Sequence, residues 1–157
     1  MTAPEIDEEP PEHGRSARYL EVLDAVPESV LEADEAALVA EVLRDACVSM
    51  AESAVNRHLE RRAAHLLTGP GFPSWAAMMA AIIGDRPFLT RRLREWTLLR
   101  TIALGEPWAA EELTGASDWF QRTASAAQVV TAPAALTLLA EHGRTRRVRN
   151  AASRRIQ

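Results

Sequence analysis

The sequence predicts an all-α fold of about eight helices in a single domain, arranged as stacked helical hairpins around a long helical segment at residues 35–67. Apolar residues recur every three or four positions across that segment, which is the period of one helix face. No run alternates apolar and polar residues as a half-buried strand would. Links of two to five residues join the helical stretches and favour antiparallel neighbours, in a solenoid-like stack or an irregular bundle.

The segment at residues 35–67 contains neither proline nor glycine. Asp34 is placed to cap it, and Thr68-Gly69-Pro70 ends it. A straight helix of this length spans about 50 Å, whereas a domain of this size is on the order of 37 Å across. We therefore expect it to bend, break or protrude, with a break around Ser49 to Ser53, where serines can bond back to the preceding turn. One helix and two helices in line both fit.

The N-terminal residues differ in composition from the rest. Residues 1–15 carry three prolines and five acidic side chains among few apolar ones. Such a segment cannot bury enough surface to offset the entropy of ordering. We expect a disordered acidic tail at 1–15 and a single α-helical domain at 16–157. Ser16 is expected to cap a short first helix, which Pro27 stops.

Glycine and proline at residues 68–73 separate two helical halves. The next predicted helix runs from Trp75 to Ile83, with Ser74 as its cap, and is apolar on every side. Such a helix is either central in the core or covered by a partner. The remaining predicted helices span residues 87–104, 108–113, 117–130, 133–141 and 145–156, with Ser117 and Thr145 as caps.

The last two predicted helices carry a repeat-like pattern. Residues 134–140 read AALTLLA and, after a break, residues 147–152 read RVRNAA. This pair resembles a HEAT repeat, an α-helical repeat whose second helix often opens with Val-Arg followed by paired alanines. Stacked repeats of that family bind other proteins, so the resemblance implies a protein-binding stack over about residues 133–156.

Charge is unevenly distributed along the chain. The formal net charge is -4, and all 18 basic residues are arginine. Residues 5–35 are strongly acidic, and residues 144–155 are strongly basic with no acid. This asymmetry indicates either an interaction tail or self-complementarity. The absence of lysine is typical of a GC-rich, bacterial coding genome.

Several features indicate a reducing compartment. The single Cys47 cannot form an internal disulfide. The N-terminus lacks the basic and apolar regions of a signal peptide, and no run of about 18 apolar residues is present. We therefore expect a cytoplasmic protein with no membrane partner.

No catalytic motif is present. His58 and His65 lie seven residues apart and could bind a metal with Glu52 or Glu60, but the chain has no Glu-x-x-His, no His-Glu-x-x-His and no cysteine pair. The better interpretation makes both histidines boundary residues of a helix face. The turn at residues 69–71 lacks the Lys-Ser/Thr of a phosphate loop. We expect no metal, no cofactor and no enzymatic activity.

Two groups of residues are candidates for partner binding. The apolar group, which either fills the core or forms a docking patch, consists of Phe72, Trp75, Met78 and Met79. The basic group consists of Arg144, Arg146, Arg147 and Arg149, followed by Arg154 and Arg155. These arginines could meet nucleic-acid phosphates, an acidic protein surface or only solvent.

The sequence favours a non-catalytic protein–protein interaction module, an adaptor or accessory subunit of a bacterial cytoplasmic assembly, whose partner is another protein or a second copy. The alternative is a nucleic-acid-binding accessory protein that uses the arginine-rich C-terminal helix. The acidic net charge and the shortage of Asn and Gln near these arginines weigh against DNA recognition. An enzyme ranks third, because it would need a site assembled from residues that carry no local motif.

Overall fold

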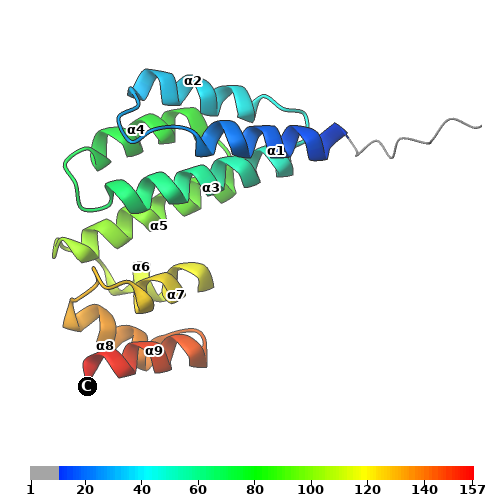
Figure 1. Cartoon of the computed structure of the whole chain (residues 1–157). Coiled ribbons are helices and arrows are strands. Elements are labelled where there is room, and N and C mark those ends of the chain that lie inside the picture. Colours follow the sequence, from blue (N-terminus) through cyan, green and yellow to red (C-terminus); the bar gives the residue numbers. More distant parts are fainter. Residues whose placement is uncertain (1–10) are drawn as a thin grey trace, which may run out of the picture. The chain divides into compact units, whose positions relative to one another are not determined.

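The computed structural model of the protein describes residues 11–157, and over that range it contains helices, turns and loops but no strand (Figure 1). The helices are α1 (Pro11–Asp24), α2 (Glu32–Leu43), α3 (Val48–Leu66), α4 (Phe72–Ile83), α5 (Pro87–Ala103), α6 (Ala110–Thr114), α7 (Asp118–Ala126), α8 (Pro133–His142) and α9 (Arg146–Ile156). The predicted all-α class is confirmed, with nine helices in the described range.

The chain divides into two compact units. The first comprises residues 1–65 and 73–90, and the second comprises residues 66–72 and 91–157. Each unit has its own buried apolar side chains, such as Val39, Val55 and Met79 in the first and Leu113, Phe120 and Leu139 in the second. The single domain expected at residues 16–157 stays a prediction.

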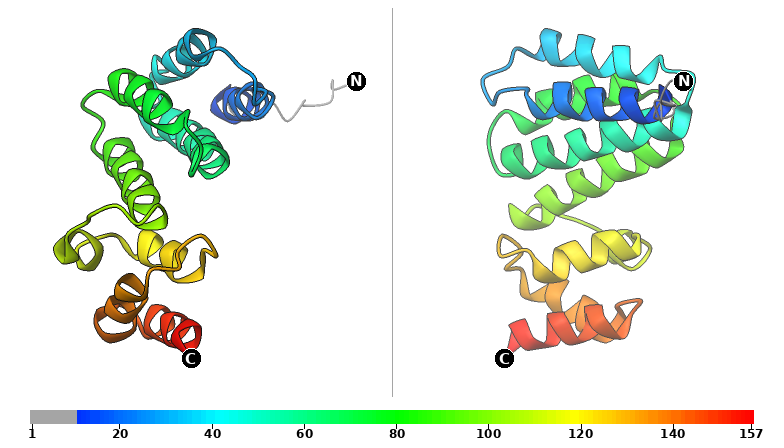
Figure 2. Two further views of the ribbon diagram at one scale, coloured as in Figure 1. Left: turned by 90° about the vertical axis from the view of Figure 1, so that its left-hand side faces the viewer. Right: turned by 45° about the vertical axis from the view of Figure 1, so that its right-hand side comes forward.

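Helices α1 to α4 of the first unit lie beside one another, and consecutive helices run in opposite directions (Figures 1 and 2). At the end of α1, Asp24 pairs with Arg57 of α3 at 3.0 Å. At the other end of the bundle, the Nη2 of Arg86, just after α4, donates to the carbonyl of Leu43 at the end of α2 (3.3 Å). These contacts tie helices that are distant in the sequence into one antiparallel bundle.

A turn at residues 44–47 interrupts the predicted long helix. The Oδ1 of Asp45 accepts a hydrogen bond from the Cys47 amide (2.9 Å), and its Oδ2 accepts from the Tyr19 hydroxyl (2.8 Å). A carboxylate that accepts from the amide two residues later stabilises a turn and competes with the helix. That amide hydrogen bond also holds the pKa of Asp45 below its usual range.

The expectation of one helix or two in line is therefore wrong, because α2 and α3 fold back on each other, and the break precedes Ser49. The first helix also differs from expectation. It begins at Pro11, which suits the first turn of a helix, so residues 11–15 are helical and do not belong to a tail. The disorder expected for residues 1–10 lies outside the described residues.

Other helix starts shift by two or three residues. α2 begins at Glu32 with Leu31 at the capping position, so Asp34 lies in the first turn and is not the cap. An acidic side chain in the first turn still stabilises the helix, because it interacts favourably with the positive end of the helix dipole. α4 begins at Phe72, and the hydroxyl of Ser74 donates to the Oε1 of Glu32 (2.7 Å) instead of capping α4.

The second unit contains most of α5 and all of α6 to α9. Two predicted caps are confirmed: the Ser117 hydroxyl accepts from the Phe120 amide (3.1 Å), and the Thr145 hydroxyl accepts from the Val148 amide (3.2 Å). Helix α7 ends at Ala126, earlier than the predicted Val130. Helices α8 and α9 form an antiparallel hairpin (Figure 1), and their resemblance to a HEAT repeat stays a prediction.

Candidate functional site

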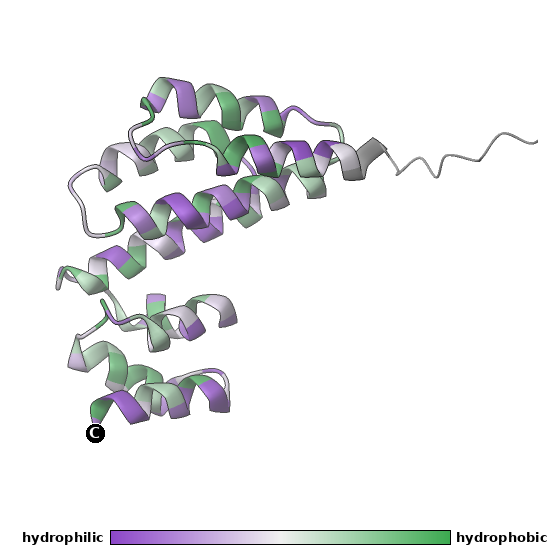
Figure 3. Cartoon of the chain, viewed as in Figure 1, coloured by the Kyte–Doolittle hydropathy of each residue, from purple (hydrophilic) through white to green (hydrophobic). Residues whose placement is uncertain are grey.

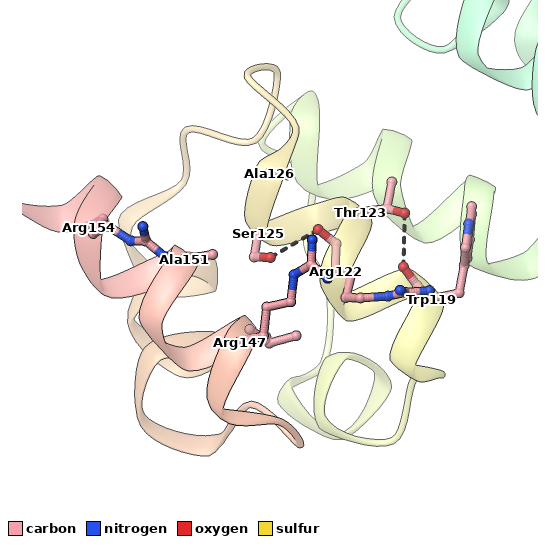
Figure 4. Close-up of a pocket in the computed structure, with 9 residues that line it drawn as sticks. Trp119, Arg122, Thr123, Ser125, Ala126, Arg147, Ala151 and Arg154 are labelled. Atoms are coloured by element: carbon pink, nitrogen blue, oxygen red, sulfur yellow. Dashed lines mark hydrogen bonds between the residues drawn. The ribbon is translucent and has the colours of Figure 1, made fainter.

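The strongest candidate site is a groove of about 450 Å³ between α7 and α9 of the second unit (Figure 4). We call it the α7–α9 groove. Its walls include Trp119, Arg122 and Ala126 from α7, and Arg147, Ala151 and Arg154 from α9. Arginines from both helices therefore line one depression.

Helical periodicity places these side chains. On α9, residues 147, 151 and 154 are spaced by four and three, so they form one stripe, while Val148 and Ala152 are buried. On α7, residues 119, 122 and 126 form a similar stripe, while Phe120 and Ala124 are buried. Figure 3 shows the resulting mixture of hydrophilic and hydrophobic residues along α9. Alanine at the middle of the α9 stripe keeps the floor of the groove low between two arginines.

The electrostatics of the groove are one-sided. Arg122, Arg147 and Arg154 are all exposed, and no acidic residue lines the groove. Over the sequence of the second unit, eleven arginines stand against six acids, a net charge of +5, whereas the first unit has seven arginines against sixteen acids, a net charge of -9. The site is therefore a basic groove on a basic unit, which favours an anionic ligand.

Trp119 lies at one end of the groove (Figure 4), where Arg92 and Trp96 contact its ring. The guanidinium of Arg92 lies over its ring at 3.8 Å from the ring centroid, and the ring of Trp96 packs against it with centroids 5.4 Å apart. A cation on the face of a tryptophan is a favourable contact. One face of the Trp119 ring is thus already occupied, so the ring serves as a wall of the groove more than as a platform for stacking.

The four arginines predicted for partner binding have different environments. Only Arg147 lines the groove. Arg144 pairs with Asp118 of α7 (3.4 Å), and the Nη1 of Arg149 donates to the carbonyl of Gly143 (2.7 Å). Arg146 is exposed on α9 outside the groove. Two of the four arginines, Arg144 and Arg149, therefore make contacts within the protein, whereas Arg146 and Arg147 are exposed.

Sequence reasoning missed the contribution of α7. Arg122 and Trp119 were not grouped with the C-terminal arginines, because no sequence signal shows that α7 packs beside α9. The spacing of four and three residues that places Arg147, Ala151 and Arg154 on one face is visible in the sequence.

A second polar cluster is buried at the centre of the first unit. The carboxylate of Glu35, on α2, accepts hydrogen bonds from the Nε2 of His58 (2.7 Å), from Arg62 through Nε and Nη2 (both 3.1 Å) and from the Nε1 of Trp75 (3.0 Å). Burial of the carboxyl raises its pKa, but hydrogen bonds from His58, Arg62 and Trp75 outweigh burial, so the pKa of Glu35 falls to about 2. This Glu35 cluster joins α2, α3 and α4 and leaves no exposed surface for a ligand.

The Glu35 cluster corrects two expectations. His58 is fully buried and is not a boundary residue, whereas His65 is half exposed and lies 3.4 Å from Glu28. The sequence left open whether the apolar group fills the core or forms a docking patch. Phe72, Trp75 and Met79 are at most 1% exposed, so these three residues belong to the core. Met78 is half-buried. Removal of Phe72, Trp75 and Met79 from water stabilises the fold, and it also keeps these three side chains out of a partner's reach.

The described residues contain neither a candidate metal site nor a candidate membrane-spanning helix. From residue 11 onward, no three His, Cys, Asp or Glu side chains gather in a way that could hold a metal ion. No helix in the same range is both long and apolar enough to cross a membrane.

Comparison with known proteins finds no family model, no curated protein and no solved structure that matches this chain.

Proposed function

We propose that this protein is a non-catalytic protein–protein interaction module, an adaptor or accessory subunit of a bacterial cytoplasmic assembly, which binds an acidic segment of a partner protein in the α7–α9 groove. The observation that supports this most is the set of three exposed guanidinium groups on its walls, with no acidic residue among the side chains that line it.

The chemistry of the groove suits carboxylates. An arginine guanidinium can donate two parallel hydrogen bonds to one carboxylate, which fixes orientation as well as adding energy. Arg147 and Arg154 are seven residues apart on α9, so their Cα atoms lie about 10 Å apart along the axis. An acidic segment with carboxylates at that spacing can therefore meet both arginines, with Arg122 on the opposite wall as a third contact.

Nucleic acid is the second candidate, because arginines also neutralise phosphates. Single strands are held by aromatic side chains on which bases stack, but one face of Trp119, the aromatic residue of this groove, is covered by Arg92. No Asn or Gln, the residues that read adenine edges, lines the groove. The groove therefore favours an acidic protein over nucleic acid.

The test compares two variants that lose the same charge. The groove variant combines Arg122→Ala, Arg147→Ala and Arg154→Ala, and the control combines Arg91→Ala, Arg94→Ala and Arg146→Ala, three exposed arginines outside the groove. Fluorescence anisotropy with a labelled glutamate-rich peptide measures affinity. Three contacts worth about 0.5 kcal/mol each predict a loss of roughly tenfold for the groove variant, and a clearly smaller loss for the control.

Equal losses in the two variants would contradict the proposal, since they would show attraction to net charge alone. An oligonucleotide of the same charge forms the second arm. If it bound more tightly than the peptide and lost affinity only in the groove variant, the nucleic-acid candidate would replace the acidic protein.

A further inference from the structure

The first unit carries an acidic stripe that matches the basic stripe of α9 in length. On α2, Asp34, Ala37 and Glu41 are spaced by three and four residues, and all three are exposed. The two carboxylates are therefore separated by seven residues, as are Arg147 and Arg154, and an alanine lies between them in both stripes. Arg44 follows Glu41 and ends the acidic run, so the acidic stripe is two turns long.

We propose that α2 of one copy of this protein docks in the α7–α9 groove of a second copy, through Asp34 and Glu41 on one side and Arg147, Arg154 and Arg122 on the other. This inference rests on the proposed function, because it uses the same groove, and it names the acidic segment that the groove takes.

The geometry of both stripes supports the pairing. Seven residues of helix rise about 10 Å, so two carboxylates on α2 and two guanidiniums on α9 fall into register when the helices lie along each other. The alanines between them, Ala37 and Ala151, allow close approach of the two backbones. Arg122, on α7, then contacts the same helix from the other wall.

The charged groups of both stripes are exposed, although the Nε of Arg154 also donates to the carbonyl of Asn150 on the same helix (3.3 Å). Asp34 and Glu41 are exposed, whereas the other acids of α2 are engaged: Glu32 accepts from Ser74 (2.7 Å), and Glu35 belongs to the buried cluster. The opposite net charges of the units, -9 and +5, attract unlike units of two copies before contact.

The proposed contact joins two different surfaces, so it is heterologous. Each added copy brings one free stripe and one free groove, and the association continues unless the rotation closes a ring. Wild-type protein should therefore show a mass that rises with concentration. Because exposed charges are screened by salt, association should be present at about 50 mM and lost at about 500 mM sodium chloride.

Two charge-reversed variants test the pairing directly by sedimentation equilibrium. The stripe variant combines Asp34→Arg and Glu41→Arg, and the groove-reversed variant combines Arg147→Glu and Arg154→Glu. Each should remain monomeric alone. Their equimolar mixture should associate, because the intact stripe of one variant pairs with the intact groove of the other and the reversed stripe pairs with the reversed groove. The chain with all four substitutions should regain self-association.

A milder stripe variant, Asp34→Asn with Glu41→Gln, provides the same loss of association if the reversed charges at the start of α2 impair folding, and circular dichroism checks that every variant is helical. A wild-type protein that stays monomeric over the full concentration range at low salt would overturn the proposal. So would a mixture of the reversed variants that fails to associate.

The two levels of the proposal fail differently. If the wild-type chain is monomeric but the glutamate-rich peptide still binds and depends on the groove arginines, the proposed function stands and the second copy is the wrong occupant. If the stripe variant is monomeric and binds that peptide more tightly than the monomeric wild type, α2 competes within its own chain, which also overturns pairing between copies. If neither copy nor peptide binds, both levels fail.

Discussion

Within each unit, a buried polar side chain connects neighbouring helices, and the two side chains differ in charge. In the first unit the ionised Glu35 accepts hydrogen bonds from residues of α3 and α4. In the second, the neutral Gln121 makes one such contact: its Nε2 donates to the carbonyls of Leu113 (3.0 Å) and Thr114 (3.3 Å), and its Oε1 accepts from the Arg144 amide (2.9 Å). Both side chains are fully buried.

This difference separates charges that stabilise from charges that are available for binding. A buried charge depends on fixed partners, and removal of one partner leaves the others uncompensated. A buried amide makes ordinary hydrogen bonds, whose loss costs less. In the second unit Gln121 makes one junction, and the buried carboxylate of Glu95, on α5, makes another by accepting from the amide and the hydroxyl of Ser117 (both 2.8 Å). The arginines of the α7–α9 groove take no part in either junction.

The largest expected effect is the loss of the Glu35 carboxylate. Glu35→Ala leaves Arg62 and His58 buried without their acceptor, so the free energy of unfolding should fall by about 3 to 5 kcal/mol. Urea denaturation measures it, with Glu41→Ala, an exposed acid on the same helix, as the control. If both variants lost similar stability, the Glu35 cluster would not be the junction of the first unit.

Lowering the pH should remove the contribution of the Glu35 carboxylate to stability without any substitution. The pKa of Glu35 in the folded protein, about 2, lies below the ordinary 4.5. Its contribution is therefore fully present above pH 4.5 and is lost as the pH falls toward 2, a change of about 3 kcal/mol. The measurement is the urea midpoint at several pH values, and Glu35→Gln should lack this part of the acid sensitivity. An identical pH dependence in that variant would contradict the assignment.

Loss of the neutral junction should have a smaller effect. Gln121→Ala removes a donor to the carbonyls of Leu113 and Thr114 and the acceptor of the Arg144 amide, which predicts a loss of about 1 to 3 kcal/mol. Thermal denaturation gives the value beside that of Glu35→Ala. A loss as large as that of Glu35→Ala would remove the distinction between the charged and the neutral junction.

The smallest effect on stability should come from the groove. Arg147→Ala with Arg154→Ala removes two exposed side chains of α9, so the free energy of unfolding should change by no more than about 0.5 kcal/mol. The same denaturation experiment measures it. A loss of several kcal/mol would mean that these arginines hold the second unit together and are not free for a ligand.

Local signals in the sequence placed many of the helix ends but not the turn at Asp45. Ser117 and Thr145 cap helices as predicted, and Gly84 and Gly105 end helices with positive φ angles of 56° and 70°. The turn at Asp45 escaped prediction because an Asp inside an amphipathic pattern looks like any exposed helical residue. Only its hydrogen bonds, to Cys47 nearby and to Tyr19 far along the chain, show that it ends the helix.

The clusters of side chains were less predictable than the helices. Burial of Glu35 depends on donors 23 to 40 residues away on two other helices, and its place in the first turn of α2 resembles that of an ordinary exposed acid. The α7–α9 groove has the same property: each stripe can be found from helical spacing, but the packing of the two helices cannot. The basic helix was therefore predicted, whereas Arg122 and Trp119 were missed.

The most direct test of the central claim, that acidic protein segments bind in the α7–α9 groove, is a titration of the ¹⁵N-labelled protein with the glutamate-rich peptide, followed by amide chemical shifts. The predicted result is a set of saturable shifts confined to residues of α7 and α9, including Arg122, Arg147 and Arg154, together with the indole N–H of Trp119. Shifts that spread over all exposed arginines, or that concentrate around Arg91 and Arg94, would contradict it.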